Sequence, residues 1–227
     1  MLGLLVYSNV LAGGSDEVNC LSPTATYLDT TFVDGVEVNS KVSYGIARHL
    51  FLTSAEFGRM VTVPPFTPPS SLAVHLQHDE KVAASYGGNW NVPESKWDHF
   101  LTYTIADRVI GPGWQGESEI EVQRYDLKIS YDLALAIKSA WGEMIRDRYR
   151  RYGCGRSGLD GTTFDFLVEG IGTGSVWSPR AGLAFEMVEL GKHLIDITKS
   201  HNQISNEQEM ALIQKLTLFE NKCRQEL

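Results

Sequence analysis

The densest group of possible metal ligands in this sequence lies between positions 75 and 99. Its members are His75, His78, Asp79, Glu80, Asp98 and His99. Imidazole and carboxylate groups hold zinc when three or four of them converge on one point. His75 and His78 share a face only in a helix, because residues three apart on a strand point to opposite sides. We expect polar residues flanking a strand and no cofactor, and we keep a zinc site at His75, His78 and His99 as the alternative.

Three tryptophans near these histidines are candidates for binding a ligand or a partner. Trp90 and Trp114 lie in loops rich in glycine, and Trp97 lies between them. An indole in a loop either packs at the edge of the core, which is the more common role, or offers a flat apolar face with one N–H donor. Because Glu94 and Asp98 are polar neighbours, we predict that these five residues form a partner- or ligand-binding surface.

A glycine-rich motif at residues 153–158 matches the pattern G-x-G-x-x-G. This pattern binds a dinucleotide where it follows a strand and opens a helix, so that helix amides face the pyrophosphate. Here a predicted helix precedes the glycines and a predicted strand follows them. We therefore interpret the motif as a helix end and a turn.

Two serines lie in glycine-rich turns, but neither completes a known nucleophile motif. Ser157 and Ser175 both lack the flanking pattern G-x-S-x-G. A serine nucleophile also needs a base that a third group orients, and sequence order does not determine such a triad. The pairs that could serve are His193 with Asp196 and His99 with Asp98. We predict turn serines and no catalytic residue.

The composition indicates a folded, acidic protein. Of the 227 residues 43% are hydrophobic and 21% are charged, which argues against global disorder. The formal net charge of −8 repels phosphate backbones, so we expect a protein partner with a basic surface and no nucleic acid. Three scattered cysteines, Cys20, Cys154 and Cys223, give no metal or redox motif. The length suits one domain over residues 1–227.

The first residues of the chain allow two interpretations. Residues 1–12 are apolar and precede Gly13-Gly14, as in the core and cleavage site of a signal peptide, but no Lys or Arg occurs before Lys41. The run is too short to span a bilayer. We expect residues 1–14 to be either a signal-like segment of a periplasmic or secreted protein or the first strand of a cytoplasmic one.

The first half of the chain has the pattern of strands. Residues 26–33 and 36–42 flank Asp34-Gly35, a pair typical of a type I′ hairpin turn. The proline-rich residues 63–71 predict an extended surface connection, because proline neither donates a ladder hydrogen bond nor continues a helix. Residues 100–105 and 118–125 alternate with period two, which predicts two neighbouring strands of an antiparallel sheet.

The second half has mainly the pattern of helices. Ser130 is the expected N-cap of a helix that ends at the glycines near 153, and Pro179 is expected to open a second helix that runs to about Thr198. A third begins at Ser205 with a capping box to Gln208. Between the first two, residues 162–168 and 175–178 predict a hairpin. Strands first and helices later favour an α+β fold, a mainly antiparallel sheet packed against about three helices.

These features together favour a non-catalytic binding protein. We expect an exported inhibitor or toxin-neutralising protein of the immunity type, acting through an acidic surface and loop tryptophans. Two alternatives stay open. One is a hydrolase with a metal site at His75, His78 and His99 or a serine-centred site, and the other is a carbohydrate-binding module that uses Trp90 and Trp114.

Overall fold

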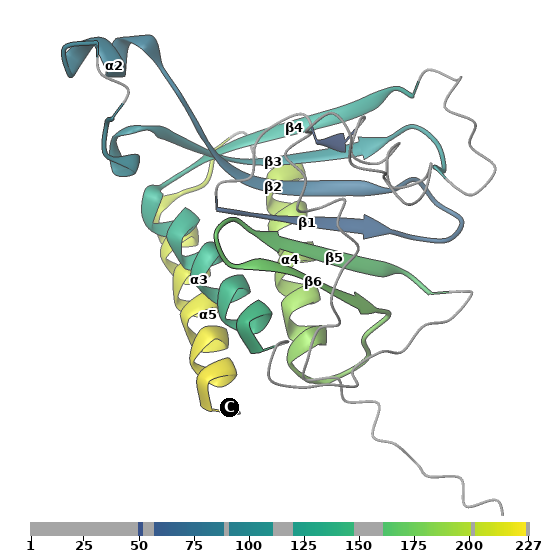
Figure 1. Cartoon of the computed structure of the whole chain (residues 1–227). Coiled ribbons are helices and arrows are strands. Elements are labelled where there is room, and N and C mark those ends of the chain that lie inside the picture. Colours follow the sequence, from purple (N-terminus) through teal and green to yellow (C-terminus); the bar gives the residue numbers. More distant parts are fainter. Residues whose placement is uncertain are drawn as a thin grey trace, which may run out of the picture.

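The computed structural model describes residues 50–51, 57–88, 91–110, 120–147, 161–200 and 203–225 (Figure 1). The elements in chain order are β1 (Gly58–Val63), β2 (Ser70–Gln77), α2 (Glu80–Ser85), the 3-10 helix η2 (Glu94–Lys96), β3 (Asp98–Ala106), β4 (Val122–Ile129), α3 (Tyr131–Asp147), β5 (Thr163–Val168), β6 (Gly172–Trp177), α4 (Gly182–Ser200) and α5 (Asn206–Gln225).

The six strands form one antiparallel sheet in the order β4-β3-β2-β1-β5-β6 (Figure 1). The first four strands follow one another along the chain, and the hairpin β5–β6 then joins the other side of β1. β3 and β4 are antiparallel neighbours, as predicted, although β4 lies about four residues later than the pattern indicated. The fold is α+β.

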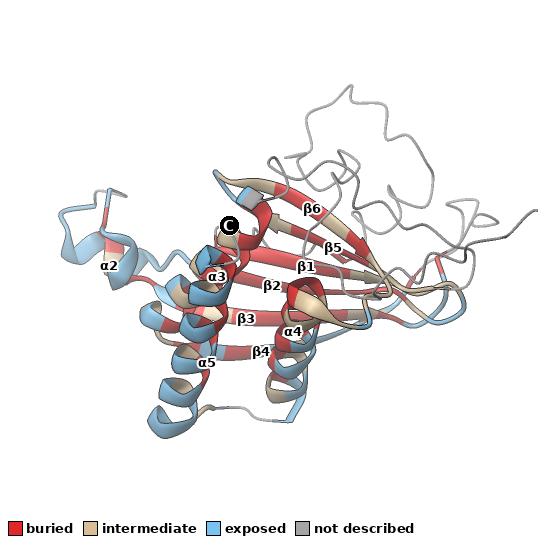
Figure 2. Ribbon diagram, turned by 90° about the horizontal axis from the view of Figure 1, so that it is seen from below, coloured by how far each residue is buried: buried red, intermediate tan, exposed pale blue. Residues whose placement is uncertain are grey.

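The three long helices all lie on the same face of the sheet (Figure 2). α3 packs beneath β5 and β6, α4 packs beneath β3 and β4, and α5 packs mainly against α3. The core fills the space between these helices and the sheet, and its largest fully buried side chain is that of Trp141. A smaller apolar cluster lies on the opposite face, where Leu50, Val61, Ala106, Ile110 and Ile120 meet.

The N-terminal caps of α3 and α5 are formed by the residues that the sequence indicates. The backbone N–H of Leu133 donates to Ser130 Oγ over 3.1 Å. Ser205 and Gln208 form the predicted capping box, because the backbone N–H of each donates to the side-chain oxygen of the other. These bonds satisfy N–H groups that have no partner within the first turn of a helix.

The prediction that Pro179 opens α4 is wrong, because the helix begins at Gly182. The backbone N–H of Ser178 donates to the Thr162 carbonyl over 2.8 Å, so the chain is still held to the start of β5 at that point. Gly182 then has a φ of +77°, outside the helical region, and regular helix follows. Val188 and Leu190 face the core as predicted, whereas Phe185 is only partly buried.

Several predictions fall on residues outside the described ones. They are the hairpin at 26–42, the signal-like segment at 1–14, the glycine motif at 153–158, Ser157, Trp90, Trp114, Cys20 and Cys154. Export therefore stays a prediction. None of the described helices is both long and apolar enough for a bilayer crossing.

Candidate functional site

The face of the sheet that carries no helix is lined by polar side chains. Strand register places the odd positions of β2 and the even positions of β3 and β4 on this face, because neighbouring residues of a strand point to opposite sides. Seven of its polar residues are almost fully buried. They are Arg59, Ser71, His75, Thr102, Thr104, Asp165 and Thr173. A buried polar group needs a hydrogen-bond partner, so these side chains form networks.

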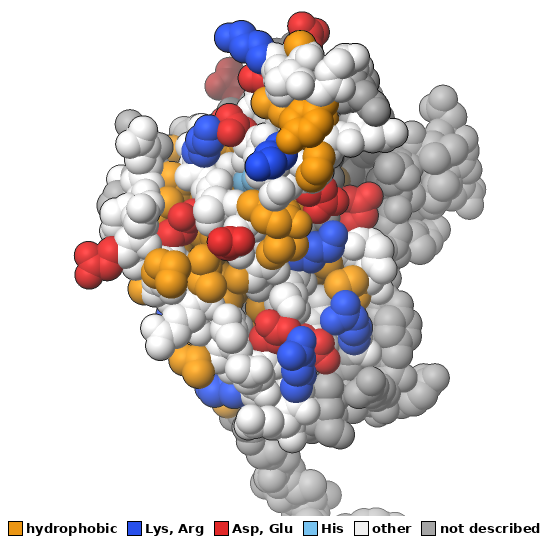
Figure 3. Space-filling model, turned by 90° about the vertical axis from the view of Figure 1, so that its left-hand side faces the viewer, with side chains coloured by type: hydrophobic (Ala, Val, Ile, Leu, Met, Phe, Trp, Pro, Cys, Tyr) orange, Lys and Arg blue, Asp and Glu red, His pale blue; other side chains and the backbone are white. Residues whose placement is uncertain are grey.

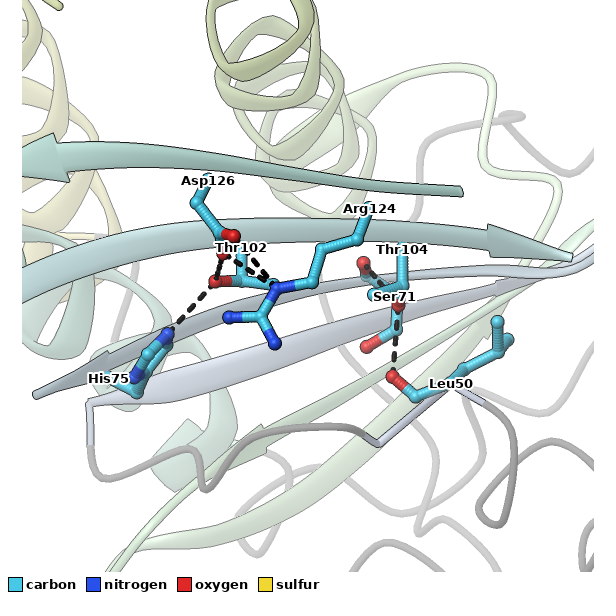
Figure 4. A network of polar contacts seen from close by, with 7 residues as sticks. All are labelled: Leu50, Ser71, His75, Thr102, Thr104, Arg124 and Asp126. Atoms are coloured by element: carbon cyan, nitrogen blue, oxygen red, sulfur yellow. Dashed lines mark hydrogen bonds and ion pairs between the residues drawn. The ribbon is translucent and has the colours of Figure 1, made fainter. Parts of the chain in front are cut away.

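One network crosses three neighbouring strands (Figure 4). His75 Nε2 on β2 lies 2.9 Å from Thr102 Oγ1 on β3, and Thr102 Oγ1 lies 2.5 Å from Asp126 Oδ1 on β4. Arg124 Nε donates to both oxygens of the Asp126 carboxylate, over 2.9 and 2.8 Å. We refer to His75, Thr102, Asp126 and Arg124 as the sheet network.

The position of the protons in the sheet network follows from the ionisation of Asp126. Burial raises the pKa of this carboxyl, but hydrogen bonds from Arg124 and Thr102 outweigh burial and hold its pKa below the usual value. An ionised carboxylate only accepts, so the single hydroxyl proton of Thr102 is donated to Asp126. The Nε2 proton of His75 must then point at Thr102.

A second set of polar contacts lies beside the sheet network on the same face. Thr104 Oγ1 donates to the Leu50 carbonyl over 2.9 Å (Figure 4), and Arg59 Nη1 donates to Ser71 Oγ over 3.3 Å. The Arg59 guanidinium carbon also lies 4.0 Å from the centre of the Phe51 ring. These contacts attach residues 50–51 to the polar sheet face, and they are among the interactions that stabilise the buried Arg59 there.

The structure does not bring together the three histidines proposed as zinc ligands. His75 lies opposite Phe100 and His99 lies opposite Leu76, so the two imidazoles point to opposite faces of the sheet. His78 follows β2 and packs its ring edge-on against Trp97 with 4.8 Å between centroids. Among the described residues no three His, Cys, Asp or Glu side chains are grouped as metal ligands.

The residues considered for a serine triad also lie apart in the fold. Ser175 lies in the middle of β6, whereas His193 and Asp196 are exposed on α4. His99 is on the helix-covered face, and the neighbouring Asp98 forms an exposed ion pair with Lys128 over 2.7 Å. The described part of the chain therefore shows no serine within a histidine–carboxylate pair.

His99 is enclosed by aromatic rings. Its centroid lies 5.2 Å from the rings of both Phe57 and Tyr131, and its Nε2 atom has no hydrogen-bond partner among the described residues. Burial lowers the pKa of His99, and the charges of Glu94 and Asp98 oppose this effect without reversing it. The folded protein therefore favours the neutral imidazole.

This lowered pKa predicts that acid destabilises the fold. Below the ordinary histidine pKa of 6.5 the unfolded chain binds a proton that folded His99 resists, so stability falls as the pH drops from 6.5 to the lowered value. One such group contributes a slope of up to about 1.4 kcal/mol per pH unit. We expect urea unfolding at stepped pH to show this slope, and His99→Phe to reduce it. His193→Gln is the matched control at an exposed histidine, and an unchanged slope in His99→Phe would contradict the assignment.

A projection between β2 and β3 carries three of the predicted binding residues at or near its base. We define the β2–β3 projection as residues 78–88 and 91–97, which include α2 and η2 and extend beyond the end of the sheet (Figures 1 and 2). Trp97 is buried at its base, where its indole N–H donates to the Val92 carbonyl over 3.3 Å. Glu94 is exposed, and so is Asp98, the first residue of β3.

The sheet network and α2 were not predicted from the sequence. The alternation of Leu101 and Tyr103 with Thr102 and Thr104 does show that β3 has one polar face. That signal separates the two faces of a strand, but it does not show that the polar face is buried.

No family model matches the chain, and no curated protein or solved structure shows significant similarity to it.

Proposed function

We propose that this protein is a non-catalytic binding protein whose β2–β3 projection contacts a protein with a basic surface. The observation that carries the proposal is the presence of exposed carboxylates, without an ion pair to the described residues, on a segment that extends beyond the end of the sheet (Figures 1 and 2). Glu80 and Glu94 are exposed and form no ion pair with the described residues. An exposed carboxylate of this kind attracts a basic partner without first giving up an internal salt bridge.

The projection also offers apolar area for such a contact. The side chain of Tyr86, just after α2, is 44% exposed, and tyrosine is enriched at protein interfaces because its ring is rigid and its hydroxyl can hydrogen-bond. On the side of the molecule seen in Figure 3, hydrophobic side chains lie among charged ones of both signs. Such a mixture is normal for a protein surface, so the exposed Tyr86 ring is the apolar feature that supports the contact.

The base of the projection supports its use as a preorganised element. Asp79 caps α2 by accepting the Lys81 backbone N–H over 2.6 Å, and Trp97 contacts both His78 and Val92. A segment that is ordered before binding loses less conformational entropy on association. The buried Trp97 therefore acts in this proposal as an anchor for the projection and does not contact the partner itself.

The proposal is tested by charge reversal on the projection. The double variant Glu80→Lys, Glu94→Lys should capture its partner from source-cell extracts at least about tenfold less strongly, because like charges at an interface cost several kcal/mol and about 1.4 kcal/mol is a factor of ten. Raised salt should weaken capture by the unmodified protein in the same direction.

Glu121→Lys is the control for this experiment, since Glu121 is an exposed carboxylate just before β4, at the end of the sheet opposite to the projection. Equal capture by all three proteins would reject the projection as the binding surface. Tyr86→Ala, which leaves the charge unchanged, separates the apolar part of the contact from the electrostatic part.

A hydrolase centred on the sheet network is the second candidate function. The observation in its favour is that Thr102 has both an imidazole and a carboxylate within hydrogen-bonding distance. Against it, Thr102 is only 2% exposed and its proton is directed to Asp126. Hydrolysis of ester substrates that is lost in Thr102→Val and retained in Glu80→Lys, Glu94→Lys would favour this candidate over the binding protein.

A further inference from the structure

Helices α4 and α5 leave an apolar groove between them on the outside of the molecule. The two helices are antiparallel, since Lys222 near the end of α5 forms an ion pair with Glu186 near the start of α4. The groove encloses about 530 Å³, and its apolar lining comes from Phe185, Leu190, Leu218 and Phe219. Leu218 is 58% exposed, so it adds accessible apolar area at the side of the groove.

The two edges of this α4–α5 groove carry opposite charges. Glu186 and Glu189 lie along the α4 edge, and Lys215 and Lys222 lie along the α5 edge. The ion pairs within the chain, from Lys222 to Glu186 and from Lys192 to Glu189, are about half exposed. Exposed pairs contribute about 0–1 kcal/mol each, so they are readily exchanged for contacts with a partner.

We propose that the α4–α5 groove is the interface of a symmetric homodimer. A twofold axis that runs along the groove, parallel to the two helices, places α4 of the second copy opposite α5 of the first. The acidic edge of each copy then meets the basic edge of the other. The same rotation directs the exposed Leu218 of each copy toward the apolar lining of its partner. A self-complementary surface of this kind is what a twofold interface requires.

The chemistry of the groove selects a second copy over other occupants. An occupant has to be apolar along its centre, basic on the side that meets α4 and acidic on the side that meets α5. The groove of a second copy, rotated by a half turn, has this arrangement. The proposal is separate from the β2–β3 projection, which belongs to another part of the fold (Figure 1). Dimerisation gives two copies of the projection in one assembly, which raises avidity for a partner with repeated sites.

Sedimentation equilibrium of the full chain tests this proposal. The unmodified protein should be a dimer, and Leu218→Glu should raise the dimer dissociation constant by on the order of 10- to 100-fold, the loss expected when a buried leucine is replaced by a charge. Met210→Glu is the matched control, because Met210 is also an exposed apolar residue of α5 but does not line the groove. It should leave the dissociation constant unchanged.

Charge exchange tests the orientation of the two copies. Glu189→Lys and Lys215→Glu should each weaken the dimer, and the double variant should restore it, because the half turn brings the two positions to within about one helical turn of each other along the groove. Circular dichroism verifies that each variant is folded. A protein that stays monomeric at the highest soluble concentration, or a dimer that Leu218→Glu leaves intact, would overturn the proposal. Saturable binding of an unrelated helical peptide in the groove of a monomeric protein would overturn it as well.

Discussion

Replacing Trp141 with alanine should lower the free energy of unfolding by about 3–5 kcal/mol, the cost of removing a large aromatic side chain from a packed core. Trp141 is fully buried on α3 and contacts Phe166 edge-to-face with 5.6 Å between ring centroids. It also lies so close to β1 that a Cβ atom on Gly58 would be 3.0 Å from its ring. Alanine would leave a cavity that the surrounding strands and helix close only in part. Urea unfolding followed by circular dichroism measures the loss.

Trp141→Phe is the matched variant for this prediction. The indole N–H of Trp141 is buried and has no hydrogen-bond partner among the described residues, so removing it also removes an unsatisfied donor. We expect a cost well below that of alanine. A loss of less than about 1 kcal/mol in Trp141→Ala, against the range for core aromatic residues, would show that Trp141 is not packed as described.

Thr102→Val should destabilise the protein by about 1–3 kcal/mol, because valine keeps the shape of threonine but leaves buried polar partners without a hydrogen bond. The change removes the acceptor for His75 Nε2 and a donor to Asp126 in the sheet network. Thr102→Ser keeps the hydroxyl and should cost less. Chemical denaturation of both variants at neutral pH is the measurement.

A double-mutant cycle shows whether the sheet network is coupled. If Thr102 donates to Asp126 as described, Asp126→Asn combined with Thr102→Val should cost less than the sum of the single changes. Strictly additive losses would mean that the hydroxyl and the carboxylate do not interact. The cycle also separates the hydrogen bond from packing changes that both single variants share.

Much of the fold could be predicted from local patterns. Period-two alternation located β3, and the helical stripe with its Ser130 cap located α3, because both signals depend on neighbours in the sequence. The Ser205–Gln208 capping box fixed the start of α5 for the same reason. The start of α4 was misplaced because Pro179 is compatible with a helix start. The contact that delays the helix joins Ser178 to Thr162, sixteen residues earlier.

The candidate sites could be predicted only in part. Glu94 and Asp98 are exposed, as residues of a binding surface must be, but Trp97 is buried, and no local signal distinguishes a loop indole that anchors from one that binds. The sheet network joins positions 75, 102 and 126, which only the register of three strands brings together. Register depends on long-range pairing, so a single sequence contains no direct record of it.

The position of β1 in the sheet sets the order in which the chain completes its structure on the ribosome. β1 pairs with β2, which follows directly, but its other neighbour is β5, about a hundred residues further on. While the ribosome translates the intervening segment, β1 keeps one open edge that can pair with another nascent chain. That edge is closed only when the β5–β6 hairpin docks against β1.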